Sequence, residues 1–295
     1  MTQVETDPDS SQNHDFGTYA LTGVSGRLLK RAQTRPPTWW GRRMALLLRK
    51  VVLKTQRPVQ HPVQIDAHLD GLNIRFHMGD NVSERKYLFT PQFFDVFERQ
   101  CIAEHLPPDG VFIDIGANAG LYTLTAAKHL SKSGRVLAIE PNPKVSKRLE
   151  SNIGFNDFSC QIDILPYGVA DENKTADLYL DPTNLGGSSL LQTRQEDHQN
   201  GQSLTIEIRT LSDLLAEQNV HAIDILKIDI EGAEEKALRP FFKTAPRSLW
   251  PRHMIIENDP AQWESGLIDW LTDDTRGYDL IKTTRMNIVL RAMVD

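Results

Sequence analysis

The sequence predicts an α/β protein whose central sheet is mainly parallel. Short apolar segments that suit inner strands alternate with segments of helical length, and two further apolar segments close the chain as a hairpin. A turn rich in glycine and alanine follows one of these strands, at Gly116–Gly120. Acidic residues also stand at the carboxyl ends of several strands, which is the edge where open α/β sheets bind ligands.

Composition sets the broad class of the protein. The chain has 295 residues, of which 40% are hydrophobic and 24% charged, so it can form one large domain with appendages or two small domains. The two cysteines, Cys101 and Cys160, are too few for a disulfide framework or a zinc site of their own. A reducing compartment, the cytoplasm, is therefore predicted.

Charge is distributed unevenly along the chain. Residues 1–15 contain four acids and no base, residues 16–65 contain ten Lys or Arg and no acid, and the remainder is strongly acidic. The acidic main part argues against nucleic acid as the principal substrate. Residues 1–20 are polar and aperiodic, and they predict a disordered tail rather than a signal peptide.

The basic segment, residues 21–62, predicts a helix around Met44–Leu48. Four apolar side chains share one face of that helix: Met44, Leu47, Leu48 and Val51. The segment is too short and too charged to span a bilayer. The favoured interpretation packs the helix on the main domain with its basic face in water. The alternative is a peripheral anchor through residues 27–57, in which paired tryptophans and basic residues rest on an anionic membrane or an acidic partner.

Residues 63–104 predict a hairpin and a helix at the start of the main domain. Val63–Met78 alternates in hydropathy around an Asp70-Gly71 turn. A helix over Phe89–Ile102 follows, and its expected buried side chains are Phe93, Phe94, Phe97 and Cys101.

The next segment predicts a nucleotide-binding unit. Val111–Ile115 and Arg135–Ile139 are expected strands, joined by the glycine turn and a helix from Leu121. Glu140 stands about twenty residues after the turn, where such units accept hydrogen bonds from ribose hydroxyls. Asn142 and Pro143 suit the N-cap and first position of the next helix.

The turn differs from the dinucleotide fingerprint, because Asn118 replaces the middle glycine. A pyrophosphate is therefore not the expected ligand. Asp114, just before the turn, would repel phosphates and attract an ammonium or a sulfonium ion. S-adenosylmethionine carries both cations and a ribose, and it is the predicted cofactor.

The rest of the chain supplies further strands and a long polar loop. Expected strands are Gln161–Val169, Lys174–Leu180, Leu204–Arg209, Ile223–Ile230, Met254–Ile256, Tyr278–Ile281 and Met286–Leu290. Gly168 and Val169 would lie beside the nucleotide base. The loop at 182–202 contains Ser188 and Ser189, which are candidate substrate-binding residues. Thr210 and Asp213 predict a capping box.

Four segments together resemble the FkbM family of S-adenosylmethionine-dependent methyltransferases: FIDIGANAGLYT, AIEPNP, GGSSL and DILKIDIEGAE. The resemblance covers about residues 105–260 and implies a Rossmann-like class I methyltransferase domain, 105–295, with a seven-stranded sheet. It also implies methyl transfer to hydroxyls of sugars, glycolipids or other small natural products. The candidate cofactor-binding residues are Asp114, Gly116, Ala117, Asn118, Gly120, Glu140, Asn142, Gly168 and Val169.

Asp229 and Glu231, which the resemblance implies lie near the methyl donor, are the candidate catalytic bases. Two nearby carboxylates raise the proton affinity of one of them, and a base helps a weakly acidic hydroxyl to react. In the structural alternative, Asp229 pairs with Lys227 and Glu231 caps the next helix. A third possibility is a divalent ion held by Asp229 with Asn258 or Asp259. The rival function is a non-catalytic scaffold that acts through the basic N-terminal helix.

Overall fold

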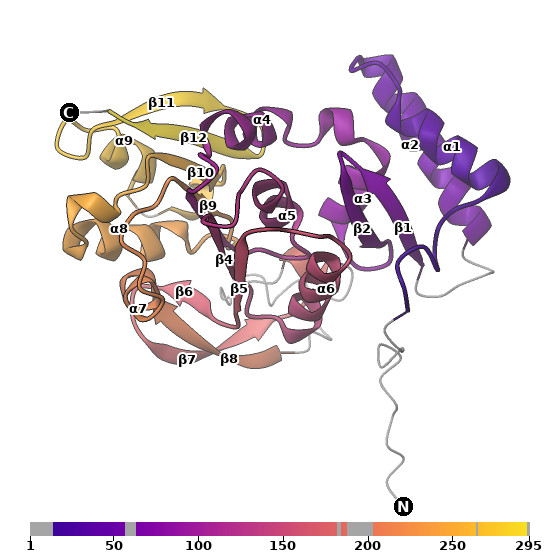
Figure 1. Ribbon diagram of the computed structural model, residues 1–295. Coiled ribbons are helices and arrows are strands. Elements are labelled where there is room, and N and C mark those ends of the chain that lie inside the picture. Colours follow the sequence, from indigo (N-terminus) through magenta and orange to yellow (C-terminus); the bar gives the residue numbers. More distant parts are fainter. Residues whose placement is uncertain (1–13, 57–62, 182–183, 188–202, 264, 294–295) are drawn as a thin grey trace, which may run out of the picture.

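A computed structural model describes residues 14–56, 63–181, 184–187, 203–263 and 265–293. Its centre is a seven-stranded sheet in the order β11-β12-β10-β9-β3-β4-β5 (Figure 1). The strands of this sheet are β3 (Val111–Ile115), β4 (Arg135–Ile139), β5 (Gln161–Leu165), β9 (Ile225–Ile228), β10 (His253–Glu257), β11 (Tyr278–Thr283) and β12 (Asn287–Ala292). β3 pairs in parallel with β4 and β9, whereas β12 runs antiparallel to both β10 and β11. The predicted fold class is confirmed.

Helices cover the sheet and extend from one side of it. They are α1 (Gly23–Gln33), α2 (Trp39–Gln56), α3 (Val82–Phe89), α4 (Val96–His105), α5 (Leu121–Ala127), α6 (Pro143–Gly154), α7 (Leu211–Glu217), α8 (Glu234–Thr244) and α9 (Leu267–Leu271). Thr210 caps α7 by accepting a hydrogen bond from the Asp213 N–H, which confirms the predicted N-terminus.

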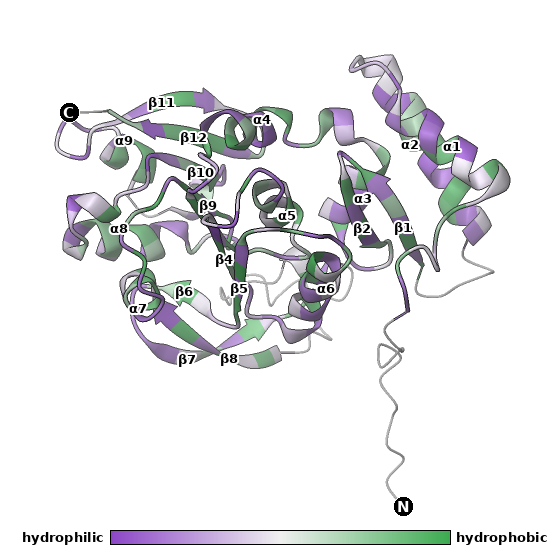
Figure 2. Cartoon of the chain, in the orientation of Figure 1, coloured by the Kyte–Doolittle hydropathy of each residue, from purple (hydrophilic) through white to green (hydrophobic). Residues whose placement is uncertain are grey.

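The core forms on both faces of the sheet because its inner strands are apolar on both sides (Figure 2). Ile113 and Leu226 pack on one face with α7 and α8, and Phe112 and Ile225 pack on the other with α4 and α5. The carboxyl ends of the parallel strands are thereby held rigidly at one edge.

Two predicted elements are divided in the structure. The expected strand Gln161–Val169 is broken at Pro166, a residue that cannot donate a ladder hydrogen bond. Its second half, β6 (Gly168–Ala170), joins a separate sheet with β7 (Lys174–Tyr179) and β8 (Ser203–Thr210). The strand expected over Ile223–Ile230 is shorter, since only Ile225–Ile228 pairs.

The helix predicted over Phe89–Ile102 is also interrupted. Phe89 ends α3, a 3-10 turn occupies Pro91–Phe93, and α4 begins only after Asp95, whose φ is 41°. Pro91 lacks the N–H that a continuous helix needs. Cys101 is buried as predicted, but Phe93, Phe94 and Phe97 are only partly buried.

The N-terminal part differs from the prediction in two ways. Part of the tail predicted to be disordered packs on the hairpin β1 (Gln64–Leu69) and β2 (Leu72–His77): the N–H groups of Gly17 and Tyr19 donate to Asp66. On α2, small residues are buried, whereas Met44, Leu47 and Val51 are exposed. The Asp70-Gly71 turn of the hairpin is confirmed by the register of β1 and β2.

Within the described residues, none of the helices combines the length and the apolar character that crossing a membrane requires.

Candidate active site

The glycine turn bends so tightly that side chains would not fit in it. Gly116 has a φ of 73°, and a Cβ there would overlap the carbonyl oxygen of Asp229 on the neighbouring strand end. Gly120 has a φ of 92°, and a Cβ there would overlap the side chain of Leu149. Both glycines are therefore needed for the backbone path and the packing of α6. Of these two glycines, Gly116 lines both of the cavities described below, and Gly120 lines neither.

Glu140 holds the turn from the end of β4. Its two carboxylate oxygens accept hydrogen bonds from the backbone N–H groups of Asn118 and Asn142, each at 2.9 Å. Each oxygen still has a lone pair for a ligand hydroxyl. Burial raises the pKa of Glu140 to about 7, although the two backbone donors oppose the shift.

Asp114 lies beneath the turn rather than on the surface of the site. It is fully buried and accepts a hydrogen bond from the Thr123 hydroxyl at 2.7 Å. Lys227 Nζ stands 3.5 Å from Asp114 Oδ1 and donates to the Gly116 carbonyl at 2.7 Å. The direct cofactor contact predicted for Asp114 does not match this geometry, because a buried lysine already neutralises the carboxylate.

A first cavity opens at the carboxyl ends of β3 and β4. Its lining is apolar at Ile139, Tyr167, Val169 and Ile206 and polar at Glu140. Gly168 lines it as well, so both residues that were predicted to lie beside the nucleotide base, Gly168 and Val169, border this cavity. Such an apolar slot beside a ribose-binding acid suits a nucleoside.

A second cavity of about 430 Å³ adjoins the first. It is lined by Ala117, Tyr122 and Asp95, and its lining also includes four cations: Arg42 of α2, Lys86, Lys227 and Arg285. The two cavities share Ser83, Lys86, Gly116, Asn118, Asp229, Glu257 and Met286. A ligand in one cavity can therefore reach a ligand in the other at this shared wall.

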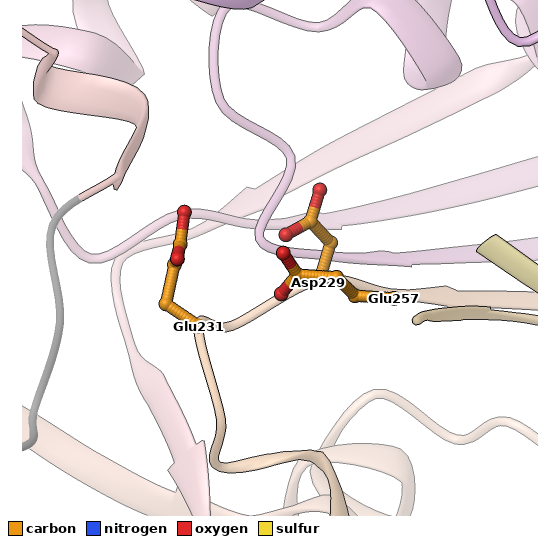
Figure 3. A group of neighbouring side chains, drawn as sticks. All are labelled: Asp229, Glu231 and Glu257. Atoms are coloured by element: carbon orange, nitrogen blue, oxygen red, sulfur yellow. The ribbon is translucent and has the colours of Figure 1, made fainter. Parts of the chain in front are cut away.

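Three carboxylates gather beside the shared wall (Figure 3). Asp229, Glu231 and Glu257 each offer an oxygen within 4.8 Å of the other two. Burial, followed by the negative charges of Asp229 and Glu231, raises the pKa of Glu257 far above its ordinary value. Glu257 is therefore protonated at neutral pH, and its O–H can donate a hydrogen bond to an oxygen of the Asp229 side chain.

The structure also tests the alternatives for this cluster. Lys227 Nζ lies 3.7 Å from Asp229 Oδ2, so the predicted ion pair is present. Glu231 does not cap α8, because Glu234 folds back to accept from the N–H groups of Ile230 and Gly232.

The metal site considered from the sequence, Asp229 with Asn258 or Asp259, differs from the group of acids that the structure brings together, Asp229 with Glu231 and Glu257. Asn258 donates to the Thr284 carbonyl, and Asp259 accepts from Gln262. A divalent ion would instead meet the three carboxylates of Figure 3.

Sequence reasoning missed Asp95, which lines the second cavity. Burial, followed by the charge of Glu98, raises its pKa to about 6. The Tyr122 hydroxyl donates to Asp95 Oδ2 at 3.1 Å. In the sequence, Asp95 is an isolated acid before a helix. Its place in the cavity could not be predicted, because only the folded chain brings it next to Tyr122.

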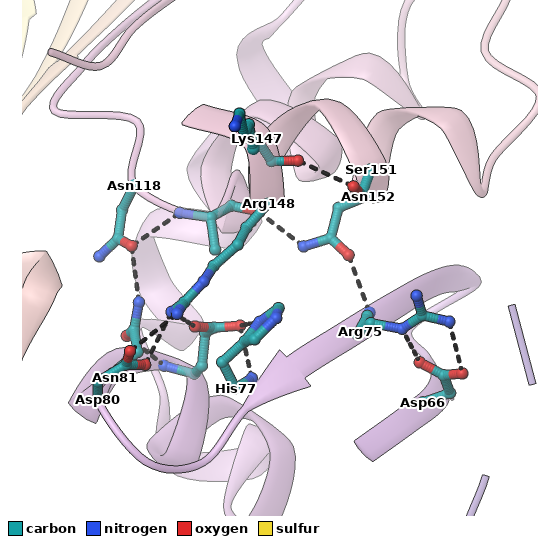
Figure 4. Close-up of polar contacts among 12 residues, drawn as sticks. Asp66, Arg75, His77, Asp80, Asn81, Asn118, Lys147, Arg148, Ser151 and Asn152 are labelled. Atoms are coloured by element: carbon teal, nitrogen blue, oxygen red, sulfur yellow. Dashed lines mark hydrogen bonds and ion pairs between the residues drawn. The ribbon is translucent and has the colours of Figure 1, made fainter. Parts of the chain in front are cut away.

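Polar contacts fasten the N-terminal elements to the turn (Figure 4). Asn81 Nδ2 donates to Asn118 Oδ1 at 2.7 Å, so the residue that replaces the middle glycine anchors α3. Arg148 of α6 makes two 2.8 Å bonds to Asp80. Asn152 joins Ala119 to Arg75. The wall of the cavities is thus built from both parts of the chain.

Asn142, Ser188 and Ser189 were also predicted to belong to the site. Asn142 is buried and caps α6, accepting from Lys144 and Val145, and it lines neither cavity. Its cofactor contact is thus not supported. Ser188 and Ser189 lie outside the described residues.

Comparisons with known proteins find a family model, sequence relatives and solved structures that are similar to this chain. The family described as "Methyltransferase FkbM domain" matches residues 114–280. The AMB antimetabolite synthetase AmbE of Pseudomonas aeruginosa is 28% identical over 249 residues, which are 72% of this chain but only 11% of that protein. The 31-O-demethyl-FK506 methyltransferase FkbM of Streptomyces tacrolimicus is 29% identical over 187 residues, 54% of this chain and 69% of that protein. A solved SAM-dependent methyltransferase from Agrobacterium tumefaciens aligns with a TM-score of 0.42 and 10% identity over 78% of this chain and 70% of that chain.

Proposed function

Because the chain belongs to the FkbM family of methyltransferases, we propose that it transfers a methyl group from S-adenosylmethionine to a hydroxyl oxygen of a sugar, glycolipid or other small natural product. The observation that carries this proposal is the wall shared by the two cavities, where Asp229 stands beside a nucleoside-shaped slot and a larger cavity. The Streptomyces relative is named for methylation at an oxygen, which supports oxygen as the atom methylated.

The residues present fit the cofactor. Glu140 would accept hydrogen bonds from the ribose, and Val169 and Ile206 would contact the adenine. The second cavity would take the methionine end and, beyond it, the acceptor. When bound, S-adenosylmethionine supplies a methyl group activated by a positive sulfur, and the carboxylate at Asp229 would stabilise that charge.

Asp229 would act as the base in the reaction. Bound S-adenosylmethionine would supply the methyl group to the acceptor oxygen and leave as S-adenosylhomocysteine, and Asp229 would take the hydroxyl proton. Glu257 and Lys227 would hold the Asp229 carboxylate in place, since Glu257 donates a hydrogen bond to it and Lys227 forms an ion pair with it. Alignment in the shared wall would supply much of the acceleration.

Calorimetry followed by methyl transfer tests this proposal. We expect the purified protein to bind S-adenosylmethionine with a dissociation constant on the order of micromolar, and to bind neither NAD nor a nucleoside triphosphate. Tritiated methyl transfer to a panel of sugars, glycolipids and polyketide alcohols then identifies the acceptor class. Cofactor binding without transfer to any hydroxyl would favour the scaffold, and preferential uptake of NAD would refute the proposal.

Asp95 is expected to control the pH dependence of acceptor use. Its pKa of about 6 means that it is protonated below pH 6 and then accepts a hydrogen bond from an acceptor hydroxyl more weakly than the carboxylate does. The value of kcat/KM for the acceptor should therefore rise as the pH increases through about 6. Asp95→Asn should abolish this rise of kcat/KM with pH, and it should raise KM for the acceptor more than it lowers kcat. Asp109→Asn, at an exposed site, is the matched control. If kcat/KM of Asp95→Asn still rose with pH through about 6, the pH dependence could not be assigned to Asp95.

Glu140 is expected to make nucleoside binding pH-dependent. Its pKa of about 7 means that raising the pH from 6 to 8 ionises the carboxyl group, which then accepts ribose hydrogen bonds more strongly. Calorimetry with S-adenosylhomocysteine, which lacks the sulfonium charge, should show tighter binding at pH 8. Glu140→Gln should abolish this dependence and weaken binding about tenfold at pH 8. Equal affinities of the wild type at both values would disprove the role.

A further inference from the structure

The outward face of α2 carries a stripe of exposed apolar side chains. Trp40, Met44, Leu47 and Val51 follow the i, i+4, i+7, i+11 spacing of one helix face, and they are 70%, 41%, 54% and 48% exposed. Trp39 precedes the stripe and is 58% exposed. A protein that remains in water seldom exposes this much contiguous apolar surface.

A basic stripe runs beside the apolar one. Arg43, Lys50 and Lys54 are exposed on the adjacent positions of the helix, and the Arg43 guanidinium lies 4.2 Å from the centre of the Trp39 ring. No acid occurs among residues 16–65, so nothing on α1 or α2 neutralises these cations.

The opposite side of α2 is packed, which fixes the direction of the exposed face. Gly41, Ala45 and Val52 are buried, and a Cβ at Gly41 would overlap the carbonyl oxygen of Pro36. The hydroxyl groups of Ser25 on α1 and Thr55 on α2 lie 3.3 Å apart and share a hydrogen bond. The two helices form one layer at the side of the molecule away from β11 (Figure 1).

We propose that this face of α2 docks on an anionic membrane, with the helix lying in the plane of the headgroups. Tryptophan prefers the boundary between lipid and water, and Lys and Arg beside it are attracted by anionic headgroups. The stripe is about 17 Å long and needs no groove in its partner. An acidic polypeptide would satisfy the cations but would leave the tryptophans in water, so a bilayer accounts for both stripes.

Docking brings the second cavity close to the bilayer. Arg42, which lies between Trp40 and Arg43 in the sequence, lines that cavity. The same helix, α2, therefore carries both the membrane face and a residue of the second cavity. A membrane-associated acceptor would then lie near the cavity that Asp229 lines.

Co-sedimentation with vesicles tests the docking. The chain of 295 residues is mixed with vesicles of phosphatidylcholine alone or with roughly one-third phosphatidylglycerol. We expect pelleting only with the anionic vesicles, and less of it at high salt because salt screens the attraction. The double variant Lys50→Glu, Lys54→Glu should lower the partition coefficient at least about tenfold. Trp39→Ala, Trp40→Ala should lower it several-fold.

The matched control reverses two exposed lysines elsewhere, Lys132→Glu and Lys282→Glu, which leaves the same net charge. It should pellet nearly as well as the wild type. Circular dichroism and cofactor calorimetry establish that each variant folds, and the sedimentation itself needs no substrate, so its outcome is independent of the proposed reaction. Equal loss in the control and the α2 variants, or retention by immobilised polyglutamate without vesicle binding, would overturn the proposal.

Discussion

Replacing Asp229 by asparagine is expected to lower kcat by a factor of about 10²–10³ while cofactor affinity changes little. Asparagine has nearly the same shape but cannot take the hydroxyl proton. Asp229 and Glu257 both line the two cavities, but the raised pKa of Glu257 keeps it protonated at neutral pH. Asp229 is therefore the carboxylate best placed to take a proton where an acceptor and a methyl donor would meet. Single-turnover rates, measured with saturating cofactor and the acceptor found in the panel, give this effect directly.

Glu231→Gln serves as the matched control for Asp229→Asn. Glu231 lines only the first cavity, so the same chemical change should cost less than about tenfold in kcat. Unchanged turnover in Asp229→Asn would show that Asp229 is not the base. Activity that is lost with EDTA and restored by Mg²⁺ would instead assign the three carboxylates to a divalent ion.

The positions of the strands, the turn and the helix cap, which the sequence predicted correctly, depend on neighbours along the chain. A strand, a glycine turn and the next strand form one local unit, so Gly116, Glu140 and the cap at Asn142 could be located from spacing alone. The positive φ of Gly116 is a backbone requirement, and only glycine adopts that conformation without strain.

The roles of Asp114 and Glu257 could not be predicted, because distant segments decide them. Asp114 lies opposite Lys227 in the register of β3 and β9, and that pairing converts an apparent cofactor contact into a buried ion pair. Glu257 is the last residue of β10, and its shifted pKa depends on Asp229 at the end of β9. No pattern within either segment contains this information.

The error on α2 has a different physical origin. Helical spacing tells which residues share a face, but it does not tell which face packs on the protein. The apolar face was expected to be buried, whereas the small residues Gly41 and Ala45 allow the closest approach and are buried instead. The exposure of Trp40, Met44 and Leu47 on the other face then follows as a consequence.

Lys227→Met is expected to destabilise the protein by about 3–5 kcal/mol, because it leaves the fully buried Asp114 without its cation. Burial alone would lower the pKa of Lys227, but Asp229 and Asp114 raise it above its ordinary value, so the ammonium is charged in the folded state. Its loss also removes the hydrogen bond to the Gly116 carbonyl. Urea unfolding measures the change in the free energy of unfolding.

Two further variants test whether the loss of stability in Lys227→Met comes from the unpaired, buried charge of Asp114. Asp114→Asn added to Lys227→Met removes the uncompensated charge and keeps an oxygen for the Thr123 hydroxyl, so it should recover about half of the loss or more. Arg291→Met, which breaks an exposed pair with Asp279, should cost less than about 1 kcal/mol. If Lys227→Met cost no more than this surface change, the ion pair beneath the turn would not be what holds the cofactor-binding backbone in place.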